Sequence, residues 1–126
     1  MNRRVLTLCL LAFLCCPALA AAQSEAVARG GSAFYSGLAV MLGTMDAPRH
    51  LYLSFTAQCM DEKAATLAVA PEAREAVILL LRQQTLADMQ TEKGKKALQD
   101  KLVTALNKAI GSPRVVRVIF TRFAIM

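Results

Sequence analysis

Residues 71–126, PEAREAVILLLRQQTLADMQTEKGKKALQDKLVTALNKAIGSPRVVRVIFTRFAIM, predict the order helix, short turn, helix, strand. Because proline lacks an amide hydrogen and disfavours a helical conformation of the preceding residue, Pro71 either begins the first helix or kinks one long helix that starts after Asp61. The helix continues through the apolar run 77–81, which covers more than one stripe of a helix. This helix is therefore expected to be covered on more than one side, between the sheet and a neighbouring helix or between subunits.

The second helix of this stretch begins near Thr91 and ends at Gly111, because glycine adopts the left-handed conformation common at helix ends. Its apolar residues recur three and four positions apart and form one face: Leu98, Leu102, Ala105, Leu106, Ala109 and Ile110. The last strand, residues 114–126, carries apolar side chains at both alternating sets of positions. We expect such a strand to lie centrally in its sheet or to be covered on both faces.

Ordered short motifs run through these elements. They are Arg82 with Thr85, Leu86 with Asp88, Thr91 with Gly94 and Lys95, Leu106 with Asn107, and Val118 with Phe120, Thr121 and Phe123. In this order and at these spacings, the stretch resembles the flagellar basal body-associated FliL family. Several ordered motifs over roughly half the chain are far more specific than one short pattern.

The resemblance implies a place and an assembly rather than a reaction, since the family has no known catalysis. It implies a periplasmic domain with a fold like that of stomatin and related SPFH proteins, which self-associates around the stator units of the flagellar motor and modulates their output. Family members commonly have an acidic residue where this chain has Arg122, and a glutamine where it has Met126. A charge-specific contact made by this strand is therefore expected to differ from that of other members.

Residues 1–20 have the parts of a signal peptide, namely Arg3 and Arg4, an apolar run, and the small-residue site 18–20. The alternative is an uncleaved membrane anchor at 5–22, which is close to the ~20 residues that a spanning helix needs. Both interpretations keep the two arginines on the cytoplasmic side and export the rest of the chain. The sequence thus predicts a domain at the periplasmic side of the inner membrane, or a soluble periplasmic one after cleavage.

The region between this segment and the first helix predicts a linker and a hairpin. Residues 23–32 are small and polar, with two adjacent glycines, and are expected to form a flexible tether. Strands are expected at 34–45 and 50–59, joined by a short turn, and Asp61 is expected to cap a following helix. The fold predicted for residues 33–126 is a single α+β domain, with a small three-stranded sheet packed with two to three helices.

The sequence offers no constellation for catalysis. His50 is the single histidine and Cys59 the single cysteine beyond residue 20, so neither a metal cluster nor a nucleophile with its base is indicated. Gly94 and Lys95 lack the earlier glycine and the preceding strand of a phosphate-binding loop. No stripe of basic residues is interleaved with aromatic ones. We therefore expect no catalytic residue, cofactor, metal or nucleic-acid partner.

A formal net charge of +6 suits acidic partners or anionic lipid. The candidate partner surface consists of five basic residues from the second helix and the last strand: Lys95, Lys96, Arg114, Arg117 and Arg122. The expected function is that of a flagellar motor accessory protein, contacting further copies of itself, stator and basal-body proteins, and the inner membrane if the anchor is retained. The alternative is a secreted periplasmic scaffold or binding module of the same fold with no motor role.

Overall fold

The computed structural model describes residues 25–126 of the chain. The signal peptide predicted at 1–20 and the alternative anchor at 5–22 lie outside the described residues, as do the first two residues of the predicted linker. Within 25–126, none of the helices combines the length and the hydropathy that crossing a bilayer requires.

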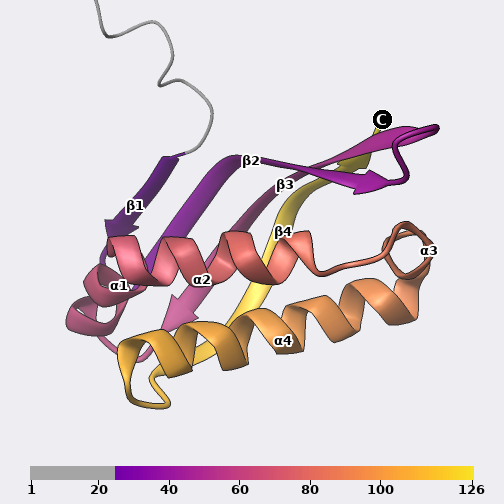
Figure 1. The fold of residues 1–126 in the computed structure, drawn as a ribbon. Coiled ribbons are helices and arrows are strands. Elements are labelled where there is room, and N and C mark those ends of the chain that lie inside the picture. Colours follow the sequence, from indigo (N-terminus) through magenta and orange to yellow (C-terminus); the bar gives the residue numbers. More distant parts are fainter. Residues whose placement is uncertain (1–24) are drawn as a thin grey trace, which may run out of the picture.

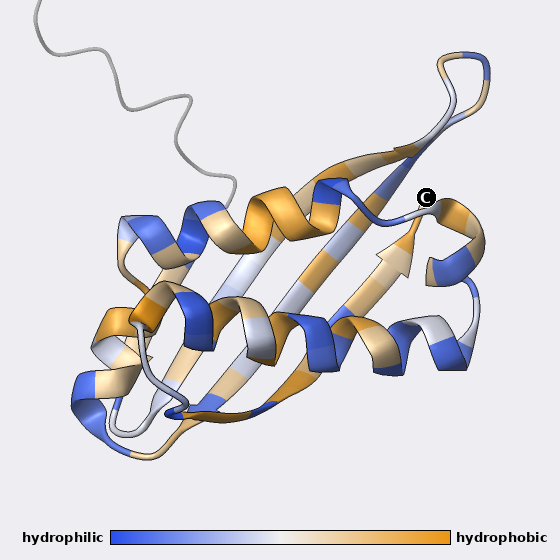
Figure 2. Cartoon of the chain, turned by 60° about the horizontal axis from the view of Figure 1, so that its bottom comes forward, coloured by the Kyte–Doolittle hydropathy of each residue, from blue (hydrophilic) through white to orange (hydrophobic). Residues whose placement is uncertain are grey.

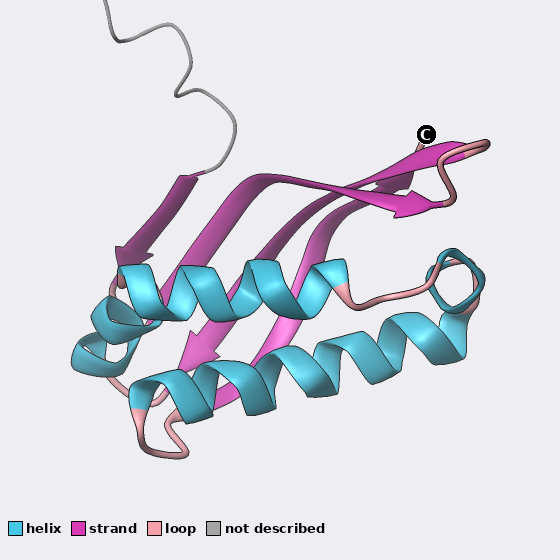
Figure 3. Cartoon of the chain, in the orientation of Figure 1, coloured by secondary structure: helices cyan, strands magenta, loops and turns pink. Residues whose placement is uncertain are grey.

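One antiparallel sheet forms the scaffold, with its strands in chain order: β1 (Glu25–Arg29), β2 (Ser32–Gly43), β3 (Pro48–Cys59) and β4 (Val115–Ile125). The helices lie between β3 and β4 in the chain: α1 (Glu62–Ala68), α2 (Pro71–Arg82), α3 (Leu86–Met89) and α4 (Glu92–Ile110). Figures 1 and 3 show α1, α2 and α4 on one side of the sheet. The α+β class is confirmed. The described residues contain four strands rather than three, and four helices, of which α3 is a single turn.

The core lies between the sheet and the helix layer. The strand residues buried there alternate along β2 and β3, and the largest of them are Tyr35, Leu38, Val40, Leu42, Leu51, Leu53 and Phe55. The fully buried helix residues facing them include Val77, Leu81, Leu98, Leu102 and Leu106. Burying each large side chain contributes about 1.5–3 kcal/mol. In Figure 2 the apolar run of α2 is a continuous orange stretch, whereas blue and orange segments alternate along α4.

The apolar run of α2 is covered on two sides, as predicted, by the sheet and by the neighbouring α4. Val77 and Leu81 are fully buried, while Ile78 and Leu80 are half-buried. Leu79 is the exception, because 50% of its surface stays exposed on the outer side of the helix.

Strand β1 corrects the prediction of a flexible tether at 23–32. Gly30 adopts a positive φ of 56° and, with Gly31, closes a two-residue turn that pairs β1 with β2. Ala26 and Ala28 face the helix side, where their small side chains fit at the sheet edge. Arg74 of α2 holds the strand, since its Nη2 donates to the carbonyl oxygen of Ala26 at 3.1 Å.

The central position predicted for the last strand is wrong, because β4 is an edge strand that pairs only with β3. Its register with β3 skips Val116 and Thr121, which mark two β-bulges. Each skipped residue moves all following side chains to the other face of the strand. The residues opposite the inward positions of β3 are consequently Val115, Val118, Phe120, Phe123 and Ile125. Apolar residues therefore occur at both alternating positions of β4 because the two bulges change which positions face the helices. They do not indicate that both faces of the strand are covered.

The ends of the helices follow local side-chain chemistry, and the predictions made from it are confirmed. Oδ1 of Asp61 accepts a hydrogen bond from the amide of Ala64 at 2.7 Å and caps α1. Pro71 starts α2 as a new helix rather than bending a longer one. Gly111 ends α4 with a left-handed φ of 84°.

Candidate partner-binding site

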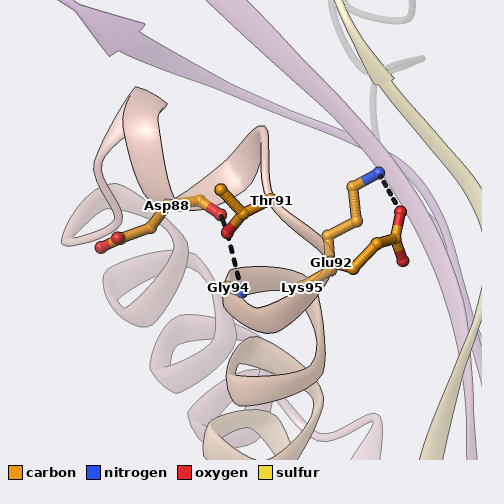
Figure 4. Close-up of polar contacts among 5 residues, drawn as sticks. All are labelled: Asp88, Thr91, Glu92, Gly94 and Lys95. Atoms are coloured by element: carbon orange, nitrogen blue, oxygen red, sulfur yellow. Dashed lines mark hydrogen bonds and ion pairs between the residues drawn. The ribbon is translucent and has the colours of Figure 1, made fainter.

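The joint between α3 and α4 is built by two threonines, Thr85 and Thr91, of which Figure 4 shows Thr91 between Asp88 and Gly94. Thr85 caps α3 by accepting from the amide of Asp88 at 3.2 Å. Oγ1 of Thr91 has two partners, since it accepts from the amide of Gly94 at 3.0 Å and donates to the carbonyl oxygen of Asp88 at 3.0 Å. One hydroxyl therefore satisfies an amide at the start of α4 and a carbonyl at the end of α3.

Gly94 is required by the same joint. A β-carbon at this position would lie 1.8 Å from the carbonyl oxygen of Asp88, closer than any real contact of this kind. The glycine thus allows the first turn of α4 to pack directly on the backbone of α3. This gives the Thr-x-x-Gly motif a structural role.

Lys95, the next residue, is held at the edge of the helix layer. Its Nζ lies 3.5 Å from Oε1 of Glu92 and 4.9 Å from the centre of the Phe123 ring in β4. An ammonium over an aromatic face contributes about 0.5–1 kcal/mol at an exposed site. Lys95 therefore connects the start of α4 with the end of β4.

Asn107 makes the corresponding connection at the far end of α4. Its Oδ1 accepts from the amide of Val115 at 2.8 Å, and its Nδ2 donates to the carbonyl oxygen of Val115 at 3.3 Å. The preceding residue, Leu106, is fully buried. The Leu-Asn motif thus fixes the point at which β4 leaves the helix.

The face of the sheet opposite the helices is uncovered among the described residues, and we call it the open face. Its pairing registers align one row of side chains across all four strands: Val27, Phe34, Thr56 and Ile119. The three apolar members are exposed by 43%, 42% and 38% in chain order. Met41 and Met126 lie on the same face beside His50 and are exposed by 59% and 61%.

Basic residues flank this apolar row. Arg29 and Arg117 lie in the adjacent row, where Nε of Arg117 donates to Oε1 of Gln58 at 2.7 Å. Arg122 lies on the other side of the apolar row, opposite Ser54. Among residues 25–126, the only carboxylate that the strands place on this face is that of Glu25. The open face therefore combines exposed apolar side chains with a positive charge.

The five basic residues predicted as a partner surface do not form one surface. Arg117 and Arg122 share the open face, whereas Lys95 and Lys96 belong to α4 on the helix side. Arg114 lies at the start of β4, with its guanidinium 3.7 Å from Oδ2 of Asp61. The structure thus brings together two of the five and adds Arg29, which the sequence interpretation had placed in a flexible tether.

Sequence reasoning also missed the apolar row. The signal was present in Gly30 and Gly31, because a two-residue turn pairs Arg29 with Ser32 and hence Val27 with Phe34. Ile119 could not be assigned to this row by alternation, since the bulge at Val116 changes its phase relative to Val115.

The titratable side chains inside the domain serve packing. Burial raises the pKa of Tyr35 above its ordinary value, partly opposed by the charge of Arg74. The ring stacks on Phe55 at 4.7 Å, and its hydroxyl donates to the carbonyl oxygen of Ala68. Burial also raises the pKa of the half-buried Cys59 thiol.

Among the described residues, no three His, Cys, Asp or Glu side chains are grouped so that they could hold a metal ion. His50 is exposed at the start of β3, as the sequence predicted.

The comparison with models of known protein families gives a match. The family model of the flagellar basal body-associated protein FliL matches residues 36–125, from within β2 to the end of β4. No curated protein matches the chain. The matched region covers well over half of the sequence and contains each of the motifs described above, and the chain therefore belongs to the FliL family.

Proposed function

We propose that this protein is an accessory component of the flagellar motor that self-associates around stator units at the periplasmic side of the inner membrane and modulates their torque by protein contacts. The observation that carries the proposal is the family match over residues 36–125, which supports association with the flagellar basal body. The family resemblance implies a stomatin-like fold that self-associates into a ring around the stator units.

The structure supports a role in protein contacts through its surfaces. The open face leaves Val27, Phe34 and Ile119 exposed, and Leu79 is half exposed on the outer side of α2. Apolar side chains gathered on one face commonly mark interaction sites. The open face is such a site, whereas Leu79 is a single exposed side chain on the helix side.

The test is swimming of a deletion strain under low and high viscous load, complemented with this gene with and without residues 1–22. We expect a load-dependent loss of motility that only the exported form restores. A matched pair of variants sharpens the result: Arg122→Glu changes the open face, while Lys101→Glu changes the outer face of α4. Normal swimming of the deletion strain at every load would refute the motor role.

A second candidate is a periplasmic scaffold of the same fold with no motor role. The feature that favours it is the small-residue site 18–20, which suits cleavage of the leader and loss of the tie to the membrane. N-terminal sequencing of the protein from the periplasm distinguishes the two, because a retained segment 5–22 would count against the scaffold.

A further inference from the structure

Strand β1 shortens the connection between the apolar segment 5–22 and the folded domain. The strand begins at Glu25, so only Gln23 and Ser24 separate it from that segment. Three residue steps from Ala22 to Glu25 span at most about 11 Å. If the segment is retained as an anchor, the start of β1 cannot move further than this from the bilayer.

The start of β1 also lies at the border of the open face. Glu25, Val27 and Arg29 alternate onto that face, and Figure 1 shows β1 entering at the top of the sheet, with α2 and α4 below it. A tether of two residues therefore brings the sheet close to the bilayer and leaves the helix layer further from it.

The chemistry of the open face fits an anionic bilayer surface. Arg29, Arg117 and Arg122 are spread along it, where their long stems can lie on the surface while the guanidinium groups reach lipid phosphates. Phe34 and Ile119 lie between them and are about 40% exposed, so they are available to insert at the boundary between headgroups and acyl chains. The single carboxylate, Glu25, lies at the edge next to the tether.

We propose that the open face of the sheet docks on the anionic headgroup surface of the membrane that holds the anchor. The inference rests on the proposed location at the inner membrane with residues 5–22 retained. A lipid surface is favoured over an acidic protein because the two-residue tether guarantees its presence. Docking in this orientation directs α2 and α4 away from the membrane, toward partners in the periplasm.

The test uses the absence of tryptophan from the chain. Two full-length variants each receive one reporter, Thr56→Trp in the middle of the open face and Thr104→Trp on the outer face of α4. Each is reconstituted in vesicles of phosphatidylglycerol and phosphatidylcholine that contain a dibrominated lipid, which quenches tryptophan at the headgroup and acyl boundary. We expect strong quenching at position 56 and little at position 104.

A second comparison tests the charges. The pair Arg117→Gln and Arg122→Gln, placed in the Thr56→Trp background, should lower the ratio of docked to undocked protein by roughly 25-fold, about 5-fold per arginine. The control pair Lys101→Gln and Lys108→Gln removes the same charge from α4 and should leave quenching unchanged. In vesicles without phosphatidylglycerol, quenching at position 56 should fall as it does with the arginine pair.

Equal quenching at both reporters, quenching at position 104 alone, or none at either would overturn the proposal. Loss of quenching with the lysine pair equal to that with the arginine pair would do the same. These outcomes are independent of swimming. Intact docking in a strain without a motility defect refutes the motor role alone, and a motility defect without docking refutes the present inference alone.

Discussion

Replacing Gly94 by alanine tests the joint between α3 and α4 most directly. The new β-carbon would lie 1.8 Å from the carbonyl oxygen of Asp88 and 2.9 Å from Oγ1 of Thr91. Real contacts of this kind do not fall below 3.0 Å, so the carbonyl must retreat by 3.0 − 1.8 = 1.2 Å. That movement separates it from the Thr91 hydroxyl and disturbs the cap of α4.

The expected cost follows from these contacts. The lost hydrogen bond costs about 1 kcal/mol, the weakened cap about 1 kcal/mol, and the displaced backbone about 1–3 kcal/mol. The higher helix propensity of alanine offsets at most about 1 kcal/mol of this loss in stability. The net loss in the free energy of unfolding is then about 2–4 kcal/mol, although glycine to alanine within a helix normally stabilises.

The assay is urea-induced unfolding followed by circular dichroism, with two controls. Thr91→Ala removes the hydroxyl without a clash and should cost about 1–2 kcal/mol. Gly111→Ala meets no atom within 4 Å but must adopt a φ of 84°, which costs about 1–2 kcal/mol. The double variant at positions 91 and 94 should lose less than the sum of the single variants, because both break the same contacts. A Gly94→Ala protein as stable as the wild type would refute this account of the motif.

Three further predictions concern the sheet. Asn107→Ala removes both side-chain partners of the Val115 backbone, so it should lower the free energy of unfolding by about 1–3 kcal/mol and speed hydrogen exchange of the Val115 amide. An unchanged exchange rate would contradict this prediction. Tyr35→Phe should lower the free energy of unfolding by about 1 kcal/mol. Because the raised pKa keeps the phenol of Tyr35 neutral in the folded state, the wild-type free energy of unfolding should fall as pH rises above about 10. It should fall more steeply than that of the variant, which lacks this phenol. Deletion of Thr121 removes a bulge and lets Arg122 follow Phe120 in regular alternation, so Phe123 should stay on the helix side and a cooperative unfolding transition should remain. Thr121→Ala, measured in the same way, should stay within about 0.5 kcal/mol of wild type, and a deletion variant without a cooperative transition would contradict the assigned register.

The helices could be predicted from sequence because their ends depend on side chains that act on neighbouring backbone. Asp61 and Thr91 satisfy amides three residues ahead, and Gly111 supplies the left-handed residue that ends α4. Pro71 likewise starts α2 by restricting its own and the preceding backbone. None of these effects requires knowledge of a distant partner.

The sheet could be predicted only in part, because strand pairing joins residues that are far apart in the chain. The hairpin of β2 and β3 was correct, but β1 was missed since its small residues have weak strand character away from their partner. The bulges at Val116 and Thr121 cannot be recognised from the pattern of apolar residues in the sequence. An unbroken alternation therefore placed Val115 and Ile119 on one face of β4, although the structure separates them.

The same limit applies to the candidate site. Basic residues can be counted in a sequence, but whether they share a surface depends on the phase of each strand. Arg117 and Arg122 are five residues apart, an odd number that would place them on opposite faces of a regular strand. The bulge at Thr121 brings them to the same face. The open face is thus a product of the irregularities in β4, and only the paired register reveals it.

The residues that identify the family and the residues that can choose a partner are separate in this chain. Thr91, Gly94 and Asn107 hold joints between elements, so their motifs report the scaffold and would persist whatever the domain binds. Arg122 and Met126, where the family resemblance implies an acidic residue and a glutamine in other members, both lie on the open face. A basic residue in place of an acidic one reverses the local charge without disturbing any of those joints. Differences in binding between family members are therefore expected on the open face.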